Sequence, residues 1–129
     1  MIEYEILNKS LFRQSLQWSP DHNFEAMQRA ELESFVRLGL RQYHVLRALD
    51  EAWSEDVQSG QIFYDEAVAS YIHERYEWWM KPCEKIVERL NRFSISDIND
   101  LEIRFAVAVA EVKKLLLTPV INNAKINTP

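Results

Sequence analysis

Apolar side chains recur at helical spacing along three long stretches of the chain, at about residues 21–57, 62–93 and 97–118. Three or four apolar positions in every two turns form one face of an amphipathic helix. In the first stretch the main apolar line consists of Phe24, Met27, Leu32, Phe35, Gly39, Tyr43, Leu46, Leu49, Trp53 and Val57. The pattern predicts three α-helices, and the first two are expected to form a long antiparallel hairpin.

The residues between these stretches are of the types that start, end or bend helices. Residues 19–21 read Ser-Pro-Asp, which places a capping hydroxyl, a proline and an acid at the expected start of the first helix. Gly60 is suited to the left-handed conformation that closes a helix. The apolar stripe of the second helix stays in phase across Pro82, which predicts one helix with a bend near residues 78–82.

The two ends of the chain lack a long helical pattern. Residues 1–19 combine a strand-like alternation with a short helix-like stretch, and the pattern leaves both conformations open. We expect them to form an apolar arm that docks on the bundle or on another subunit. Residues 119–129 are polar and are expected to form a tail. The sequence thus predicts one all-α domain over residues 1–129, an antiparallel helical bundle with a docked N-terminal arm.

The composition agrees with an all-α fold. Only two of the 129 residues are glycine and four are proline, so the chain is poor in the residues that make turns and hairpins. Its 47% hydrophobic and 27% charged residues are typical of a globular protein and not of a disordered one.

Charge and cysteine content exclude several classes of function. A net charge of −5 opposes the phosphate backbone, so we do not expect nucleic acid as a partner of the whole molecule. The single cysteine, Cys83, excludes an internal disulfide and a multi-thiolate metal site, and it fits the reducing cytoplasm. The first residues do not resemble a signal peptide, and the longest apolar run, residues 105–110, is too short to span a bilayer. We expect a cytoplasmic protein that does not bind membranes.

The histidines are the obvious candidates for catalysis or metal binding. His44 and His73 fall on helix faces that the pattern assigns to solvent, where an imidazole is usually only a polar side chain. Dinuclear metal sites in bundles need Glu-x-x-His on two helices, and the chain contains no such motif. It also has no glycine-rich phosphate loop. We therefore expect no metal, no cofactor and no catalytic residue.

Arg37 and His44 offer one enzymatic alternative. Their spacing, Arg-x6-His, resembles the motif of HEPN-type ribonucleases, a family of small, all-helical and often dimeric enzymes. The resemblance implies that Arg37 holds a phosphate and that His44 acts as the acid and base. In that family the motif lies later in the fold, beside a dimer interface, whereas here it lies on the first long helix.

Two features favour binding of another protein. Trp78 points off the core stripe toward basic side chains, a combination that is enriched at interfaces. The third helix is apolar on most sides, which leaves a surface for a partner or for a second copy. The partner-binding candidates are Trp78, Lys85, Arg89, Val107 and Ala110.

A structural ion pair is the last candidate. Arg75 falls inside an apolar stripe, and a buried arginine needs a carboxylate partner. Asp50 lies at a similar distance on the other side of the hairpin turn, so the two side chains are expected to face each other. The alternative, that Arg75 extends to solvent, stays open.

These observations favour a small cytoplasmic protein that binds proteins. We expect an adaptor, an inhibitor or an assembly factor, without enzymatic activity, that acts as a homodimer or with a larger partner. A HEPN-like ribonuclease is the alternative, and an accessory subunit of a nucleic-acid-processing complex is the third hypothesis.

Overall fold

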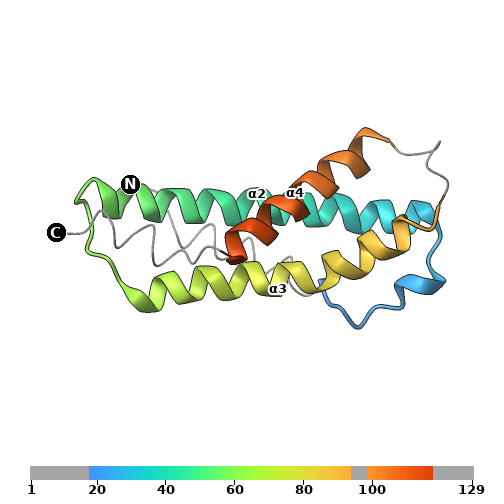
Figure 1. Ribbon diagram of the computed structural model, residues 1–129, viewed down its shortest axis with the longest axis horizontal. Helices are drawn as coiled ribbons and strands as arrows, with labels where there is room; N and C mark the ends of the chain where they lie inside the picture. Colours follow the sequence, from blue (N-terminus) through green and yellow to red (C-terminus); the bar gives the residue numbers. More distant parts are fainter. Residues whose placement is uncertain (1–17, 94–98, 118–129) are drawn as a thin grey trace.

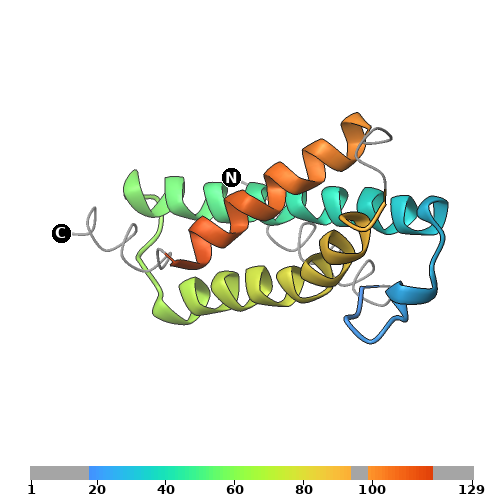
Figure 2. The same ribbon diagram turned by 45° about the vertical axis from the view of Figure 1, so that its right-hand side comes forward.

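The computed structural model describes residues 18–93 and 99–117. These residues form a short 3-10 helix, η1 (Phe24–Ala26), and three α-helices, α2 (Arg29–Gln58), α3 (Glu66–Leu90) and α4 (Asp100–Leu117). Helices α2 and α3 lie side by side as an antiparallel hairpin, and α4 lies obliquely on them with its C-terminal end between the two (Figures 1 and 2). The predicted all-α bundle is confirmed. The expected polar tail and all but the last two residues of the expected arm lie outside the described residues.

Helix α2 begins later than the sequence pattern predicted. The Ser-Pro-Asp segment forms only a turn, in which Ser19 Oγ accepts a hydrogen bond from the backbone N–H of Asp21 at 3.1 Å. The helix starts at Arg29, where Gln28 and Glu31 form a reciprocal capping box. Residues 18–28 are therefore a separate segment, which packs against α3 through η1.

The turn between α2 and α3 follows the prediction at Gly60. This residue has φ +80°, the left-handed conformation that costs glycine little. Asp65 then caps α3 by accepting a hydrogen bond from the N–H of Ala67 at 2.8 Å. The cap explains why α3 starts at Glu66 and not at residue 62.

Helix α3 continues through Pro82 as one element. In both views its axis bends within the half that contains Pro82 (Figures 1 and 2). Proline lacks an N–H and crowds the carbonyl four residues earlier, which is the physical cause of such a bend. The structure thus agrees with the predicted single, bent helix.

The centre of the core is an arrangement of two tryptophans around a glycine of α2. Trp18 Nε1 donates to the carbonyl of Trp79 at 3.1 Å, and Trp79 Nε1 donates to the carbonyl of Gly39 at 2.9 Å. A Cβ atom at Gly39 would lie 2.7 Å from Trp18 Cη2 and 3.0 Å from Phe105 Cε1. Gly39 is therefore the residue that lets the N-terminal segment, α3 and α4 meet on α2.

Two ion pairs fasten α4 to α2, one toward each end. At the first, the guanidinium of Arg29 binds the carboxylate of Glu102 through two hydrogen bonds of 2.8 and 2.7 Å. At the second, Glu111 binds the hydroxyl of Tyr43 and lies 3.4 Å from Nε of Arg47. The middle of α4 is held between these contacts. No helix of the described ranges, 18–93 and 99–117, combines the length and hydropathy needed to cross a bilayer.

Candidate functional site: a basic groove between α2 and α4

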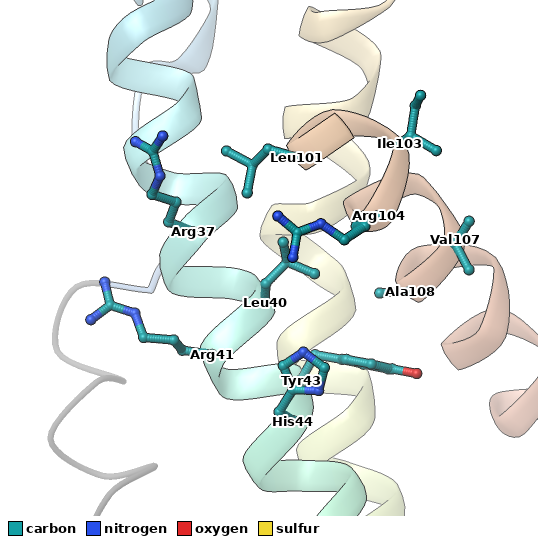
Figure 3. Close-up of a pocket in the computed structure, with 10 residues that line it drawn as sticks. All are labelled: Arg37, Leu40, Arg41, Tyr43, His44, Leu101, Ile103, Arg104, Val107 and Ala108. Carbon is teal, nitrogen blue, oxygen red and sulfur yellow. The ribbon is translucent and has the colours of Figure 1, made fainter. Parts of the chain in front are cut away.

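A groove of about 670 Å³, open to solvent, lies between the two ion pairs that hold α4 on α2 (Figure 3). We call it the α2/α4 groove. Its α2 side is formed by Arg37, Leu40, Arg41, Tyr43 and His44. Its α4 side is formed by Leu101, Ile103, Arg104, Val107 and Ala108. The groove thus combines apolar side chains with cationic ones.

Helical periodicity explains why the basic groups gather on this groove. Arg37, Arg41 and His44 are spaced four and three residues apart, so they lie on one face of α2. Arg104 extends from α4 toward α2 and completes the set (Figure 3). Leu40 lies between the basic side chains and faces α4.

The cationic groups of the groove are almost free of acidic partners. Among the described residues, Arg37 and Arg41 form no ion pair, and Arg104 pairs only with the exposed Asp100, at 3.1 Å. The ring of His44 contacts Tyr43, and within residues 18–93 and 99–117 it has no hydrogen-bond partner that would fix its tautomer. The groove therefore has a positive local charge on a protein whose net charge is −5.

Helix α4 carries an apolar surface on its outer side as well. Val107 is 61% exposed and Ile103 is 52% exposed, while Phe105, Ala108 and Val112 fill the core side of the same helix. The outer surface continues along α4 at helical spacing, and we call it the α4 outer stripe: Ile103, Val107, Ala110 and Leu117. Val107 and Ala110, two of the partner-binding candidates, are exposed, and their role in binding stays a prediction.

A polar cluster beside the groove joins α2 to α3. The hydroxyl of Tyr76 donates to Asp50 Oδ2 at 2.8 Å, and Arg47 Nη1 lies 3.0 Å from the same oxygen. Burial and the nearby Asp50 raise the pKa of Tyr76. Burial and the hydrogen bond to Glu111 raise the pKa of Tyr43 to about 12. These phenols stay protonated at neutral pH and act as structural donors.

The expected ion pair between Asp50 and Arg75 is not formed, because Arg47 and Tyr76 occupy the Asp50 carboxylate. The guanidinium of Arg75 instead stacks on the ring of Trp78, 4.0 Å from its centroid. Burial lowers the pKa of Arg75, and its Nε has no hydrogen-bond partner. Trp78 is half-buried by this contact and by the core, so it presents less surface than expected.

Lys85 and Arg89 have partners within the chain. Lys85 Nζ donates to the carbonyl of Pro20 at 2.8 Å, and Arg89 Nη2 donates to the carbonyl of Met27 at 3.2 Å. Arg89 also lies over the ring of Phe93, 4.5 Å from its centroid. These two cations hold the segment before α2 against α3, a role that the sequence did not predict.

His73 differs from expectation in its burial. Its side chain is 29% exposed, Nε2 lies 3.0 Å from Glu77 Oε1, and Nδ1 is buried without a partner. Within residues 18–93 and 99–117, no group of three or more His, Cys, Asp or Glu side chains is placed to hold a metal ion. Burial raises the pKa of the Cys83 thiol, which makes it a poor nucleophile.

The structure thus brings Arg37 and His44 to one groove and leaves the Asp50–Arg75 pair apart. Arg104 and the α4 side of the groove were not predicted from the sequence. The spacing of Arg37, Arg41 and His44 was a usable signal, but its meaning depends on where α4 lies. Comparisons of the chain with protein-family models, with curated proteins and with solved structures find no match.

Proposed function

We propose that this chain is a cytoplasmic protein-binding protein, an adaptor, inhibitor or assembly factor, whose partner occupies the α2/α4 groove and the α4 outer stripe. The observation that carries the proposal is the exposure of Ile103 and Val107, 52% and 61%, on a helix whose other side is already packed in the core. Such apolar surface beside a groove is typical of protein interfaces. The polar part of the interface is supplied by the guanidinium groups that border the groove, those of Arg37, Arg41 and Arg104.

The same groove is poorly suited to general acid–base catalysis. General acids and bases are tuned by burial and by convergent partners in a cleft. His44 is exposed, and among the described residues no acidic side chain lines the groove. The proposal therefore treats Arg37, Arg41 and His44 as binding residues.

A HEPN-like ribonuclease is the second candidate, because Arg37 and His44 line one groove. Under that hypothesis, purified protein cleaves RNA, and His44→Ala abolishes the cleavage while the bundle stays folded. An accessory subunit of a nucleic-acid-processing complex would bind RNA or DNA without cleaving it.

Quantitative co-purification tests the proposed function. The tagged full-length chain is isolated from cells together with its bound proteins, in parallel with Val107→Asp and with the control Gln61→Asp. Both variants add one negative charge at an exposed position, but Gln61 lies in the loop between α2 and α3.

The proposal predicts a discrete partner that Val107→Asp loses at least about tenfold and that Gln61→Asp retains, as for a residue at the centre of an interface. Equal recovery with both variants, or no partner with the wild type, contradicts it. If RNA co-purifies and its recovery depends on Arg37 and His44, the second candidate, a HEPN-like ribonuclease, is favoured instead.

A further inference from the structure

We infer that the occupant of the α2/α4 groove is an acidic amphipathic helix of a partner protein. The inference rests on the proposed function and adds the chemistry of the partner. An amphipathic helix binds such grooves by placing apolar anchors at helical spacing on the floor. Here the floor offers Leu40, Leu101 and Ala108, and the exposed Val107 borders it.

The charge of the groove selects an acidic occupant. Arg37 and Arg41 stand on its α2 side without acidic partners among the described residues; Arg41 extends away from α4, and Arg104 extends from α4 toward α2 (Figure 3). Complementary charges across an interface speed association and exclude the wrong partner. Carboxylates along the two edges of the bound helix would contact the guanidinium groups of α2 at one edge and that of Arg104 at the other.

A second copy of the chain fits this surface poorly. Lys113 and Lys114 are exposed on the last turns of α4, and Arg104 is exposed near its start. Packed in parallel through the α4 outer stripe, two α4 helices would bring equal cations together. Packed antiparallel, they would offer these cations only Asp100, which already pairs with Arg104 at 3.1 Å, because Glu102 and Glu111 are bound to Arg29 and to Tyr43. Like charges in contact across an interface are unfavourable. The charges of α4 therefore favour a different protein over a homodimer formed through α4 at this face.

RNA is a less suitable occupant than a peptide. Proteins that bind single-stranded nucleic acid stack bases on exposed aromatic rings along a positive groove. Among the described residues that line the groove, Tyr43 is the only aromatic ring besides His44, and its hydroxyl is hydrogen-bonded to Glu111. The exposed side chains next to the cations, Ile103 and Val107, are aliphatic and have no counterpart in a phosphate backbone.

Two designed peptides test the inference. Both are amphipathic helices of about 20 residues, roughly the length of α4, with one leucine face. One peptide carries glutamate on its polar face and the other carries lysine. Fluorescence anisotropy measures their binding to the full-length wild type, to the double variant Arg37→Glu/Arg41→Glu and to Lys81→Glu. Lys81 is an exposed cation of α3, and its reversal serves as the control for a charge change outside the groove.

We expect the glutamate peptide to bind at least about tenfold tighter than the lysine peptide. The double variant should reverse this preference, and Lys81→Glu should change it less than about twofold. Between 0.1 M and 1 M salt the screening length falls from about 10 Å to about 3 Å, so the preference should shrink.

Equal binding of both peptides, or binding of neither, overturns the inference. An RNA oligonucleotide that binds tighter than the glutamate peptide, and loses affinity in Arg37→Glu/Arg41→Glu, also overturns it. The proposed function fails separately, when Val107→Asp and Gln61→Asp recover the same proteins from cells. A partner that depends on Val107 but shows no preference for the acidic peptide would retain the function and reject the acidic helix.

Discussion

Replacing Gln42 by leucine should stabilise the protein. Gln42 is fully buried in α2, and neither its Nε2 nor its Oε1 has a hydrogen-bond partner. Leaving a buried amide unpaired costs about 1–3 kcal/mol. Leucine removes that cost in a side chain of similar size, and the change of shape offsets part of the gain, up to about 1.5 kcal/mol. The expected net gain in the free energy of unfolding is about 1–2 kcal/mol.

Urea unfolding followed by far-UV circular dichroism measures this gain. For a chain of this size, each kcal/mol gained in the free energy of unfolding raises Tm by about 3–5 °C. Gln58→Leu is the control, because Gln58 is exposed at the end of α2 and its replacement should stay within about 0.5 kcal/mol of wild type. A loss of more than about 1 kcal/mol in Gln42→Leu, with an unchanged m-value, would show that the amide is hydrogen-bonded after all.

Three further predictions concern the core, the alkaline range and the proposed interface. Gly39→Ala should lower the free energy of unfolding by about 1–2 kcal/mol and shift tryptophan fluorescence to the red, because the new Cβ would displace Trp18; unchanged fluorescence and stability would refute this. The pKa of the Tyr43 hydroxyl is raised from 10.0 to about 12, so the stability that the protonated hydroxyl contributes is complete below pH 10.0 and is lost as the pH rises to about 12. Tyr43→Phe removes this group and should flatten that part of the pH–stability curve. A curve identical to that of the wild type would contradict the raised pKa. Val107→Asp should leave the free energy of unfolding within about 0.5 kcal/mol of wild type, because the side chain is exposed, and a larger loss in urea unfolding would show a structural role.

The bundle itself was predictable because the helical pattern is long and strongly periodic. Gly60 and Pro82 behave as their backbone chemistry dictates, one in the left-handed region and one inside a bent helix. The start of α2 was not predictable in the same way. Two capping signals compete there, and the reciprocal bonds of Gln28 and Glu31 outweigh the Ser-Pro-Asp segment.

The candidate site could be predicted only in part. Periodicity placed Arg37 and His44 on one exposed face, but it gives no information on where a third helix packs. The predicted pairing of Asp50 with Arg75 was wrong for a related reason. The Asp50 carboxylate is bound instead by Arg47, one turn earlier on the same helix, and by Tyr76 of α3. Tertiary placement decides such contacts, and a single sequence carries little signal for it.

The most direct test of the account is photo-crosslinking in living cells with a photoreactive residue at position 107 or, as the control, at position 74. Val107 lies on the α4 outer stripe beside the α2/α4 groove, whereas Glu74 is exposed on α3. We expect a protein adduct of defined mass at position 107, absent at position 74 and lost when Arg37 and Arg41 are both changed to Glu. Equal adducts at both positions, no adduct at 107, or an adduct with nucleic acid would contradict the claim that this surface binds a protein.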